Sequence, residues 1–278
     1  MRIVVLQAVA AKDNSVDNKR AADLMRRNMN LVKQRDTEIT FRIPRRGITG
    51  LESFFYTYIH HLNDEEAFHA AVQAEMDGFD AVIMGCYFDP ILRDVRQAVN
   101  IPVVGPAESS MLLATMMGAK FGIVTISAEA VYDYEENIAK YGLQERAVRP
   151  RPIPETAEEQ ETAFTDAHHE IAAFIQVARE LIADGADVLI PGCTAITTAL
   201  RLAPGAEKEY PNGLTEVDGV PVMDVLGATV KMAETLVAFK QAGSSWISRK
   251  GLYAQATPKA IELGQMLLKY DGPGFWDY

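Results

Sequence analysis

Two cysteines occur in this chain of 278 residues, and both end a segment of the same pattern. Residues 78–86 and residues 185–193 each read Gly, any residue, Asp, four mostly apolar residues, Gly and Cys. A buried strand in each copy would carry one thiol, Cys86 or Cys193, to the sheet edge where ligands bind. Two thiols that face one carbon could remove a proton from one side and add a proton on the other. We therefore expect Cys86 and Cys193 to be catalytic.

A predicted helix follows each cysteine, from Asp89 onward in the first copy and from Thr194 onward in the second. The unpaired N–H groups and positive dipole end of such a helix would lower the pKa of each thiol. The same N–H groups can hold a carboxylate or an enolate. A single free cysteine is more often a small residue of the core. Two equivalent positions that hold both cysteines favour a catalytic pair instead.

The composition limits the partners that this chain can have. Apolar residues make up 48% of the chain and charged residues 23%, as in ordinary folded proteins. The net charge of −11 argues against nucleic acid and anionic membrane surfaces, so we expect a small-molecule substrate. Neither Cys-x-x-Cys nor His-x-x-x-His occurs, so we expect no metal site. The formation of a homo-oligomer remains possible.

The N-terminus begins with a short apolar run, Met1–Leu6, that ends before Lys12. Such a run predicts a strand and not a signal peptide. No apolar stretch approaches the roughly 20 residues of a membrane span. We therefore expect a cytoplasmic protein, in which the two cysteines stay thiols.

Short apolar runs alternate with helical patterns along the chain, which favours right-handed βαβ crossovers and parallel sheets. The predicted strands are 3–7, 38–43, 81–84, 103–104, 121–126, 148–151, 188–190 and 220–223. The predicted helices are 17–34, 53–77, 90–99, 108–117, 129–141, 157–183, 195–200, 226–242 and 257–269. Residues 101–104 correspond to residues 220–223, and residues 121–124 restart the pattern of residues 1–4. Each half therefore contains the same order of elements.

Two segments fall outside this repeat. Residues 203–219 are rich in Pro, Gly and charged residues, which predicts a loop. A plain surface loop is favoured over a lid that covers the site. The tail ends with Phe275 and Trp276. We expect these apolar side chains to pack on the body of the protein or on a partner subunit.

The cysteine motifs resemble those of the aspartate/glutamate/hydantoin racemase superfamily, and the first is most similar to hydantoin racemases. Residues 85–90, Gly-Cys-Tyr-Phe-Asp-Pro, resemble their Gly/Ala-Cys-x-x-Asp-Pro segment. Residues 101–108 resemble their Ile-Pro-Val-Val-Gly-x-Ala-Glu segment, and residues 192–194 resemble the Gly-Cys-Thr of aspartate and glutamate racemases. The resemblance covers about residues 1–243 and leaves the tail outside.

This resemblance implies an α/β fold of two pseudosymmetric lobes, each a parallel sheet flanked by helices, with the site in the cleft between them. In the family the last helix of each half crosses over to the other lobe. Lobe one would then hold residues 1–105 and 225–278, and lobe two would hold residues 106–224.

The resemblance implies a cofactor-independent racemase in which Cys86 and Cys193 are opposed acid and base at a carbon α to a carbonyl. Its substrate would be a 5-substituted hydantoin or a related amino-acid derivative. Backbone N–H groups near the cysteines would stabilise the enolate, and the two aromatic residues after the first cysteine would form an apolar wall. The expected substrate contacts are Gln7, Tyr87, Phe88, Thr125, Ser127 and Thr194. Turn or cap chemistry is an equal alternative for Gln7, Thr125 and Ser127.

The sequence departs from both standard types of the family. Residues 7–10 read Gln-Ala-Val-Ala where hydantoin racemases carry Asn-Pro-Asn-Thr. Residues 192–196 read Gly-Cys-Thr-Ala-Ile instead of their Gly-Cys-Ala-Gly-Met. Two other reactions on the same scaffold therefore stay open, a maleate-type cis–trans isomerisation and an arylmalonate-type decarboxylation. A non-catalytic two-lobed binding protein is the remaining alternative, whereas a thiol hydrolase would need a His motif that the sequence does not offer.

Overall fold

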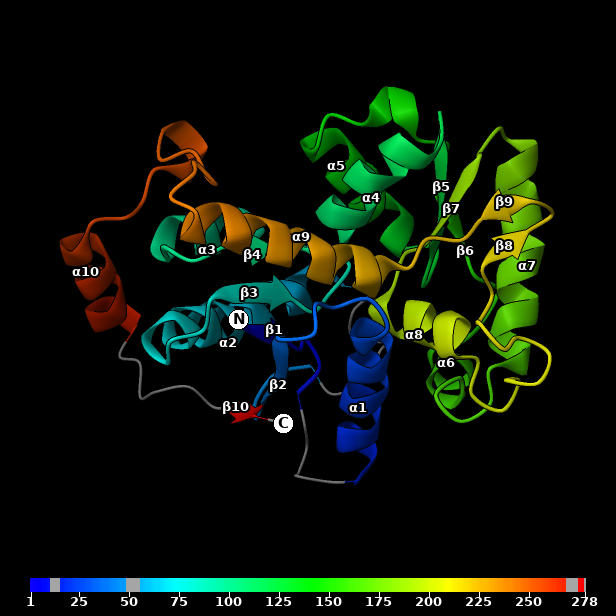
Figure 1. The fold of residues 1–278 in the computed structure, drawn as a ribbon, viewed down its shortest axis with the longest axis horizontal. Helices are drawn as coiled ribbons and strands as arrows, with labels where there is room; N and C mark the ends of the chain where they lie inside the picture. The colour runs from blue at the N-terminus through cyan, green and yellow to red at the C-terminus, as the bar shows by residue number, and fades with distance from the viewer. Residues whose placement is uncertain (11–15, 49–55, 269–274, 278) are drawn as a thin grey trace.

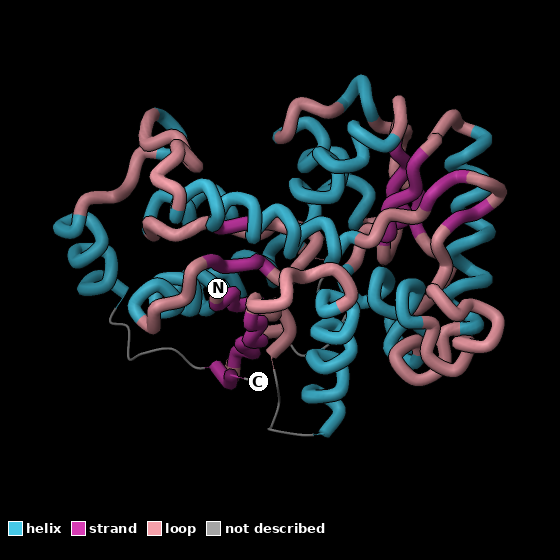
Figure 2. Tube along the Cα trace, in the orientation of Figure 1, coloured by secondary structure: helices cyan, strands magenta, loops and turns pink. Residues whose placement is uncertain are grey.

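The computed structural model describes residues 1–10, 16–48, 56–268 and 275–277, and they form two α/β regions (Figure 1). The strands gather in two separate groups with helices around each, as Figure 2 shows. The first sheet has the order β10-β2-β1-β3-β4, and the second has the order β6-β5-β7. All strand pairs within these two sheets are parallel except that of β10 with β2.

The first sheet has helices on both faces, and these helices bury its strands on both sides. Helices α1 and α9 pack on one face around Val5, and helices α2 and α3 pack on the other face around Val4. The elements are β1 (Arg2–Leu6), α1 (Val16–Asn30), β2 (Glu38–Pro44), α2 (Thr57–Met76), β3 (Ala81–Met84), α3 (Leu92–Ala98) and β4 (Val103–Val104).

The second sheet lies in a separate hydrophobic cluster that α4, α5, α7 and α8 complete. The elements are α4 (Pro106–Met117), β5 (Phe121–Thr125), α5 (Ala130–Lys140), β6 (Arg151–Pro152), α6 (Ala157–Thr162), α7 (His168–Ala183), β7 (Val188–Pro191) and α8 (Thr194–Leu202). Then come β8 (Glu216–Val217), β9 (Val220–Pro221), α9 (Val225–Gln241), α10 (Pro258–Leu268) and β10 (Phe275–Asp277). Two short 3-10 helices lie at Gln144–Arg146 and Gly251–Tyr253.

Helices α4 and α9 connect the two regions. Met111 of α4 is buried in the cluster of the second sheet, whereas Val230 of α9 is buried in the cluster of the first. The two helices also pack against each other. The lobe boundaries at residues 105/106 and 224/225 stay a prediction.

The internal repeat reappears in the pairing of strands. Val82 of β3 pairs with Val103, and the equivalent Leu189 of β7 forms an isolated parallel bridge with Val222. The repeated Asp has a structural role in both halves. Asp80 accepts a hydrogen bond from the N–H of Arg2 at 2.7 Å, and Asp187 accepts two from the N–H groups of residues 119 and 120, each at 2.8 Å. Each Asp therefore fixes the start of the neighbouring strand.

The structure differs from the predicted elements in three places. The helix predicted over residues 157–183 is two helices, α6 and α7, and Asp166 between them accepts a hydrogen bond from the N–H of His168. Residues 216–217, expected in a loop, form β8 and pair antiparallel with β9. The tail ends as β10, which extends the first sheet along β2. Among the described residues, no helix is both long and apolar enough to cross a membrane.

Candidate active site

A cavity of about 490 Å³ opens at the carboxyl ends of strands from both sheets. Cys86 follows β3 and Cys193 follows β7; both line this cavity, and neither is in a disulfide. The other lining residues are Gln7, Ala8, Val9, Arg20, Ala21, Ala22, Met25, Ile43, Gly85, Tyr87, Phe88, Ile126, Tyr134, Glu161, Phe164, Thr165, Gly192, Thr194 and Ala195. The fold therefore brings the last residues of both repeated motifs to the same cavity.

The glycine before each cysteine lets two strands come close together. The Gly85 N–H donates to the Leu6 carbonyl at 2.7 Å, and the Gly192 N–H donates to the Val124 carbonyl at 2.8 Å. A Cβ at Gly85 would lie 2.5 Å from that Leu6 oxygen, and one at Gly192 would lie 2.6 Å from the Tyr134 ring. The repeated glycine is thus required by packing, and it fixes where each thiol leaves its strand.

Cys86 enters a turn and not a helix. Asp89 and Ile91 have φ values of 48° and 45°, and α3 begins only at Leu92. Burial raises the pKa of the Cys86 thiol well above its ordinary value, although the Phe88 N–H faces the sulfur and opposes this shift. The helix predicted from Asp89 onward begins three residues later, at Leu92, because residues 86–91 form the turn.

Cys193 is the residue before the first turn of α8 and has an extended backbone with a φ of −152°. The N–H groups of Ala195 and Ile196 face its sulfur. Burial still raises the pKa of the Cys193 thiol, to about 11. The prediction of a lowered pKa is therefore wrong for both thiols, because loss of water outweighs the helix end and the backbone N–H groups.

Asp89 of the Gly-Cys-x-x-Asp-Pro motif is bonded to the start of α4. Its carboxylate accepts hydrogen bonds from the N–H groups of Ala107 at 3.1 Å and Glu108 at 2.7 Å, at the start of α4. The Tyr141 hydroxyl also donates to it at 2.7 Å. Burial raises the pKa of Asp89 to about 6. This residue joins the cysteine turn to the helix that connects the two regions.

Tyr87 and Phe88 differ in burial, although the ring of each lies 5.2 Å from the Tyr134 ring. Tyr87 is buried, with its hydroxyl 3.3 Å from the Ser110 hydroxyl and its ring 5.2 Å from the Tyr134 ring. Phe88 is half-buried, and its ring centroid lies 4.7 Å from that of His60. Both residues line the cavity, so an aromatic wall stands beside Cys86.

Gln7 and Thr194 are the polar residues among the expected contacts that line the cavity. The Gln7 side-chain amide donates to the Met25 sulfur at 3.3 Å. The Thr194 hydroxyl lies 3.4 Å from the Gly85 carbonyl and links the two cysteine motifs. Thr194 is also the first residue of α8.

Thr125 and Ser127 do not line this cavity. The fully buried Thr125 hydroxyl donates to the Ser127 carbonyl at 2.7 Å. The Ser127 hydroxyl accepts from the Ala130 N–H at 3.2 Å, at the start of α5. The residue between them, Ile126, faces the cavity instead. The structure gives Thr125 and Ser127 turn and cap contacts, and their contact with substrate stays a prediction.

Several lining residues were not expected from the sequence. Met25 and Ile43 belong to a hydrophobic cluster of the first sheet, and Phe164 packs against that cluster from the turn after α6. Tyr134 of α5 donates its hydroxyl to the Gly192 carbonyl, directly before Cys193. Helical periodicity marks Met25 and Tyr134 only as core positions, so no signal in the sequence separates them from the rest of the core.

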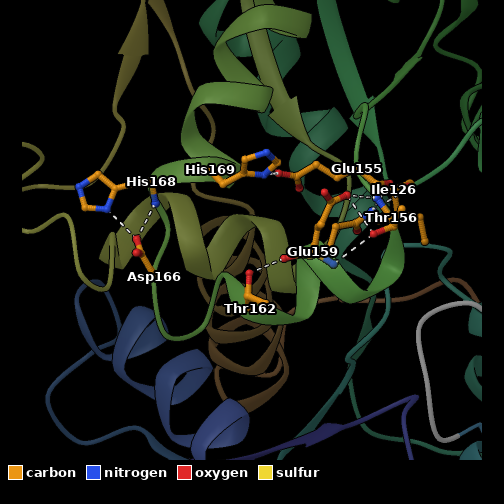
Figure 3. A network of polar contacts seen from close by, with 9 residues as sticks. Ile126, Glu155, Thr156, Glu159, Thr162, Asp166, His168 and His169 are labelled. Carbon is orange, nitrogen blue, oxygen red and sulfur yellow. Dashed lines mark hydrogen bonds and ion pairs between the residues drawn. The ribbon is translucent and has the colours of Figure 1, made fainter.

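A network of polar contacts holds α6 beside the cavity (Figure 3). Thr156 and Glu159 form a capping box at the start of α6. Gln160 donates to the carbonyl of the cavity residue Ile126 at 2.9 Å. Glu155 contacts His169. These contacts fix the segment that carries Phe164 and Thr165.

Glu170 forms a buried acid pair with Glu155. Neither oxygen of Glu170 has a hydrogen-bond donor among the described residues. Burial and the neighbouring carboxyl of Glu155 raise the pKa of Glu170 far above its ordinary value of 4.5. Within the described ranges, no three His, Cys, Asp or Glu residues gather in a way that could hold a metal ion.

Comparison with known proteins places the chain in a family. The Asp/Glu/hydantoin racemase family matches residues 30–233. A hydantoin racemase of Pseudomonas sp. (strain NS671) is 31% identical over 207 residues, which cover 73% of this chain and 75% of that relative. A hydantoin racemase of Rhizobium meliloti is 28% identical over 167 residues, which cover 59% of this chain and 63% of that relative.

Solved structures agree on the fold. The allantoin racemase from Klebsiella pneumoniae superposes with a TM-score of 0.71 at 24% identity and covers 94% of this chain and 95% of its own. The allantoin racemase from Pseudomonas fluorescens has a TM-score of 0.68, also at 24% identity, with 93% and 98% covered. These likenesses support the expected α/β architecture. Because the family match spans most of the chain, this protein belongs to the Asp/Glu/hydantoin racemase family and is a racemase.

Proposed function

We propose that this chain is a cofactor-independent racemase that inverts C5 of 5-substituted hydantoins, with Cys86 and Cys193 as opposed acid and base. The observation that carries the proposal is the position of the two free thiols, at equivalent strand ends and on the wall of one cavity. The relatives named hydantoin racemase support this substrate class.

In the proposed reaction, one cysteine is a thiolate and the other is a thiol. The thiolate removes the proton from C5, and the electron pair of that bond moves into the adjacent carbonyl to give an enolate. The thiol then donates its proton to the opposite face of C5, so the two cysteines exchange protonation states. The backbone N–H groups at the start of α8, with Thr194, stabilise the negative charge in this step.

The raised pKa of both thiols fits a proton transfer from carbon. A thiolate whose pKa is raised by burial is a stronger base than an exposed one, and the C–H bond next to a carbonyl is a weak acid. The same raised pKa also means that only a small fraction of each thiol is ionised at neutral pH. Activity should therefore increase as pH rises from neutral toward the pKa of Cys193, about 11.

The proposal is tested by polarimetry on single enantiomers of several 5-substituted hydantoins, with maleate and an arylmalonate as competing substrates. We expect loss of optical rotation with the wild type, and a fall in rate of at least about 100-fold in both Cys86→Ala and Cys193→Ala. Turnover of maleate or arylmalonate without hydantoin racemisation would assign the site to one of the alternative reactions. Hydantoin binding that neither variant changes, without turnover, would support the non-catalytic alternative.

A further inference from the structure

One side of helix α5 contacts both cysteine motifs. Tyr134, Asn137 and Tyr141 are spaced by three and four residues, which places them one above the other on a helix. Tyr134 and Asn137 are buried within α5, and Tyr141 is the half-buried residue directly after it. We call these three residues the α5 clasp.

Tyr134 holds the peptide bond that leads into Cys193. Its hydroxyl donates to the Gly192 carbonyl, which belongs to the same peptide bond as the Cys193 N–H. The Tyr134 ring also lies 5.2 Å from the ring of Tyr87 and 5.2 Å from the ring of Phe88, which follow the other cysteine. A single side chain of α5 therefore contacts both motifs.

Asn137 and Tyr141 hold the turn that follows Cys86. The Asn137 side-chain amide donates to the Phe88 carbonyl at 2.9 Å, and the Tyr141 hydroxyl donates to the Asp89 carboxylate at 2.7 Å. The N–H of the same Phe88 faces the Cys86 sulfur. Both hydrogen bonds therefore hold a residue that lies within three positions of the thiol.

The α5 clasp joins parts of the molecule that belong to different sheets. Cys86 follows β3 of the first sheet, and Cys193 follows β7 of the second. Helix α5 itself packs on β5 and β6 of the second sheet (Figure 1). One more hydrogen bond links it to the first region, from the Arg93 side chain of α3 to the Lys140 carbonyl at 3.0 Å.

A helix gives these contacts a fixed spacing. Tyr134 and Asn137 are three residues apart, which is about 4.5 Å along a helix axis. Their partners, the Gly192 and Phe88 carbonyls, therefore keep a separation that α5 sets. Inversion at carbon needs both thiols within reach of one atom, and a misplacement of about 1 Å can slow such a step about 100-fold.

We propose that the α5 clasp sets the separation of the two thiols, and that Tyr134, Asn137 and Tyr141 are positioning residues for inversion at C5. This inference rests on the proposed function, since it assumes that Cys86 and Cys193 act on opposite faces of one carbon.

A loosened clasp should leave proton removal intact and impair proton delivery to the opposite face. One thiolate still takes the proton from C5, and the electron pair of that bond still moves into the carbonyl. The thiol that results exchanges its proton with solvent water. In heavy water it returns a deuteron to the same face, so the C–H bond becomes a C–D bond without inversion.

The test follows one pure enantiomer of a 5-substituted hydantoin in heavy water and measures two rates, deuterium gain with retention and inversion. We expect inversion to fall at least about tenfold in Asn137→Ala and in Tyr141→Phe, and the ratio of retention exchange to inversion to rise at least about fivefold. Neither residue lines the cavity, so the effect must pass through the turn. Tyr141→Phe removes one hydroxyl and serves where Asn137→Ala does not fold.

Asn28→Ala and Tyr132→Phe are the matched controls. Asn28 is also buried, and its side-chain amide also donates at 2.9 Å, to Asp224 outside both cysteine motifs. Tyr132 is on α5 but 67% exposed. Both controls should keep the wild-type ratio, even where Asn28→Ala loses stability.

A wild-type ratio in a folded clasp variant, with both rates unchanged or lowered equally, would overturn the inference, because loss of folded protein alone lowers both rates together. Absence of inversion by the wild type would instead count against the proposed function.

Discussion

The two cysteine motifs share a sequence pattern but lead into different surroundings. Cys193 begins a helix, and two backbone N–H groups face its sulfur. Cys86 begins a turn, and one N–H, that of Phe88, faces its sulfur. Burial raises the pKa of Cys86 most, and the neighbouring Cys193, Asp89 and Asp64 raise it further. Of the two thiols, Cys193 is therefore the one that holds a negative charge more easily.

The repeated motif therefore fixes the position of each thiol without fixing its acidity. The Gly of both motifs permits close strand packing, and the Asp of both fixes the start of the next strand. Burial raises the pKa of both thiols, and it raises that of Cys86 further. When one of the two thiols ionises, we therefore expect it to be Cys193.

The shared part of the comparison is tested by Gly85→Ala and Gly192→Ala. Both should lower the free energy of unfolding by about 1–3 kcal/mol, because the new methyl group meets the Leu6 oxygen in the first and the Tyr134 ring in the second. Urea denaturation followed by circular dichroism measures the change. Gly264→Ala in α10 is the control and should not destabilise, since no atom lies within 4 Å of the new Cβ. Unchanged stability in Gly85→Ala would show that the glycine is not required by packing.

The difference between the thiols is tested by alkylation with iodoacetamide at pH 8. Cys193 should react at least about tenfold faster than Cys86, since one unit of pKa changes the thiolate fraction tenfold. Both thiols line the same cavity, and both cysteines are half-buried. Peptide mass spectrometry gives the two rates, and the single Cys→Ser variants check each assignment. Faster modification of Cys86 would reverse the proposed order.

A second contrast between the halves lies in Asn63 and Glu170, which stand at the same distance before each repeated motif. The Asn63 side chain accepts from the Ile48 N–H at 3.0 Å and donates to the Ala8 carbonyl at 3.1 Å. Glu170 faces the carboxyl of Glu155 instead. The buried amide of Asn63 is thus hydrogen-bonded to backbone groups, whereas the buried Glu170 faces a second acid that raises its pKa.

Glu170→Gln should make stability less dependent on pH. Above pH 4.5 an unfolded Glu loses its proton while folded Glu170 keeps it, so stability falls as pH rises toward the raised pKa. The fall is at most about 1.4 kcal/mol per pH unit for one proton. Thermal unfolding between pH 5 and pH 9 should show a flatter profile in the variant. An equal slope in both proteins would mean that Glu170 titrates normally.

Much of the fold could be predicted, because buried parallel strands give continuous apolar runs and the two halves repeat them. The same repeat places Cys86 and Cys193 at equivalent strand ends, which predicts that both face one cavity. The sign of their pKa shifts could not be predicted, since it depends on how much water the folded chain removes. Met25 and Phe164 were missed for a similar reason, because a core residue and a cavity residue have the same periodicity.

The most direct test of the two-thiol account is deuterium exchange at C5 in heavy water, starting from each pure enantiomer of one hydantoin. The wild type should incorporate deuterium as it racemises. Cys86→Ala and Cys193→Ala should not racemise, and each should retain slow exchange on one enantiomer only, opposite between the two variants. Exchange of the same enantiomer by both variants, or racemisation by either at the wild-type rate, would contradict opposed acid and base catalysis by Cys86 and Cys193.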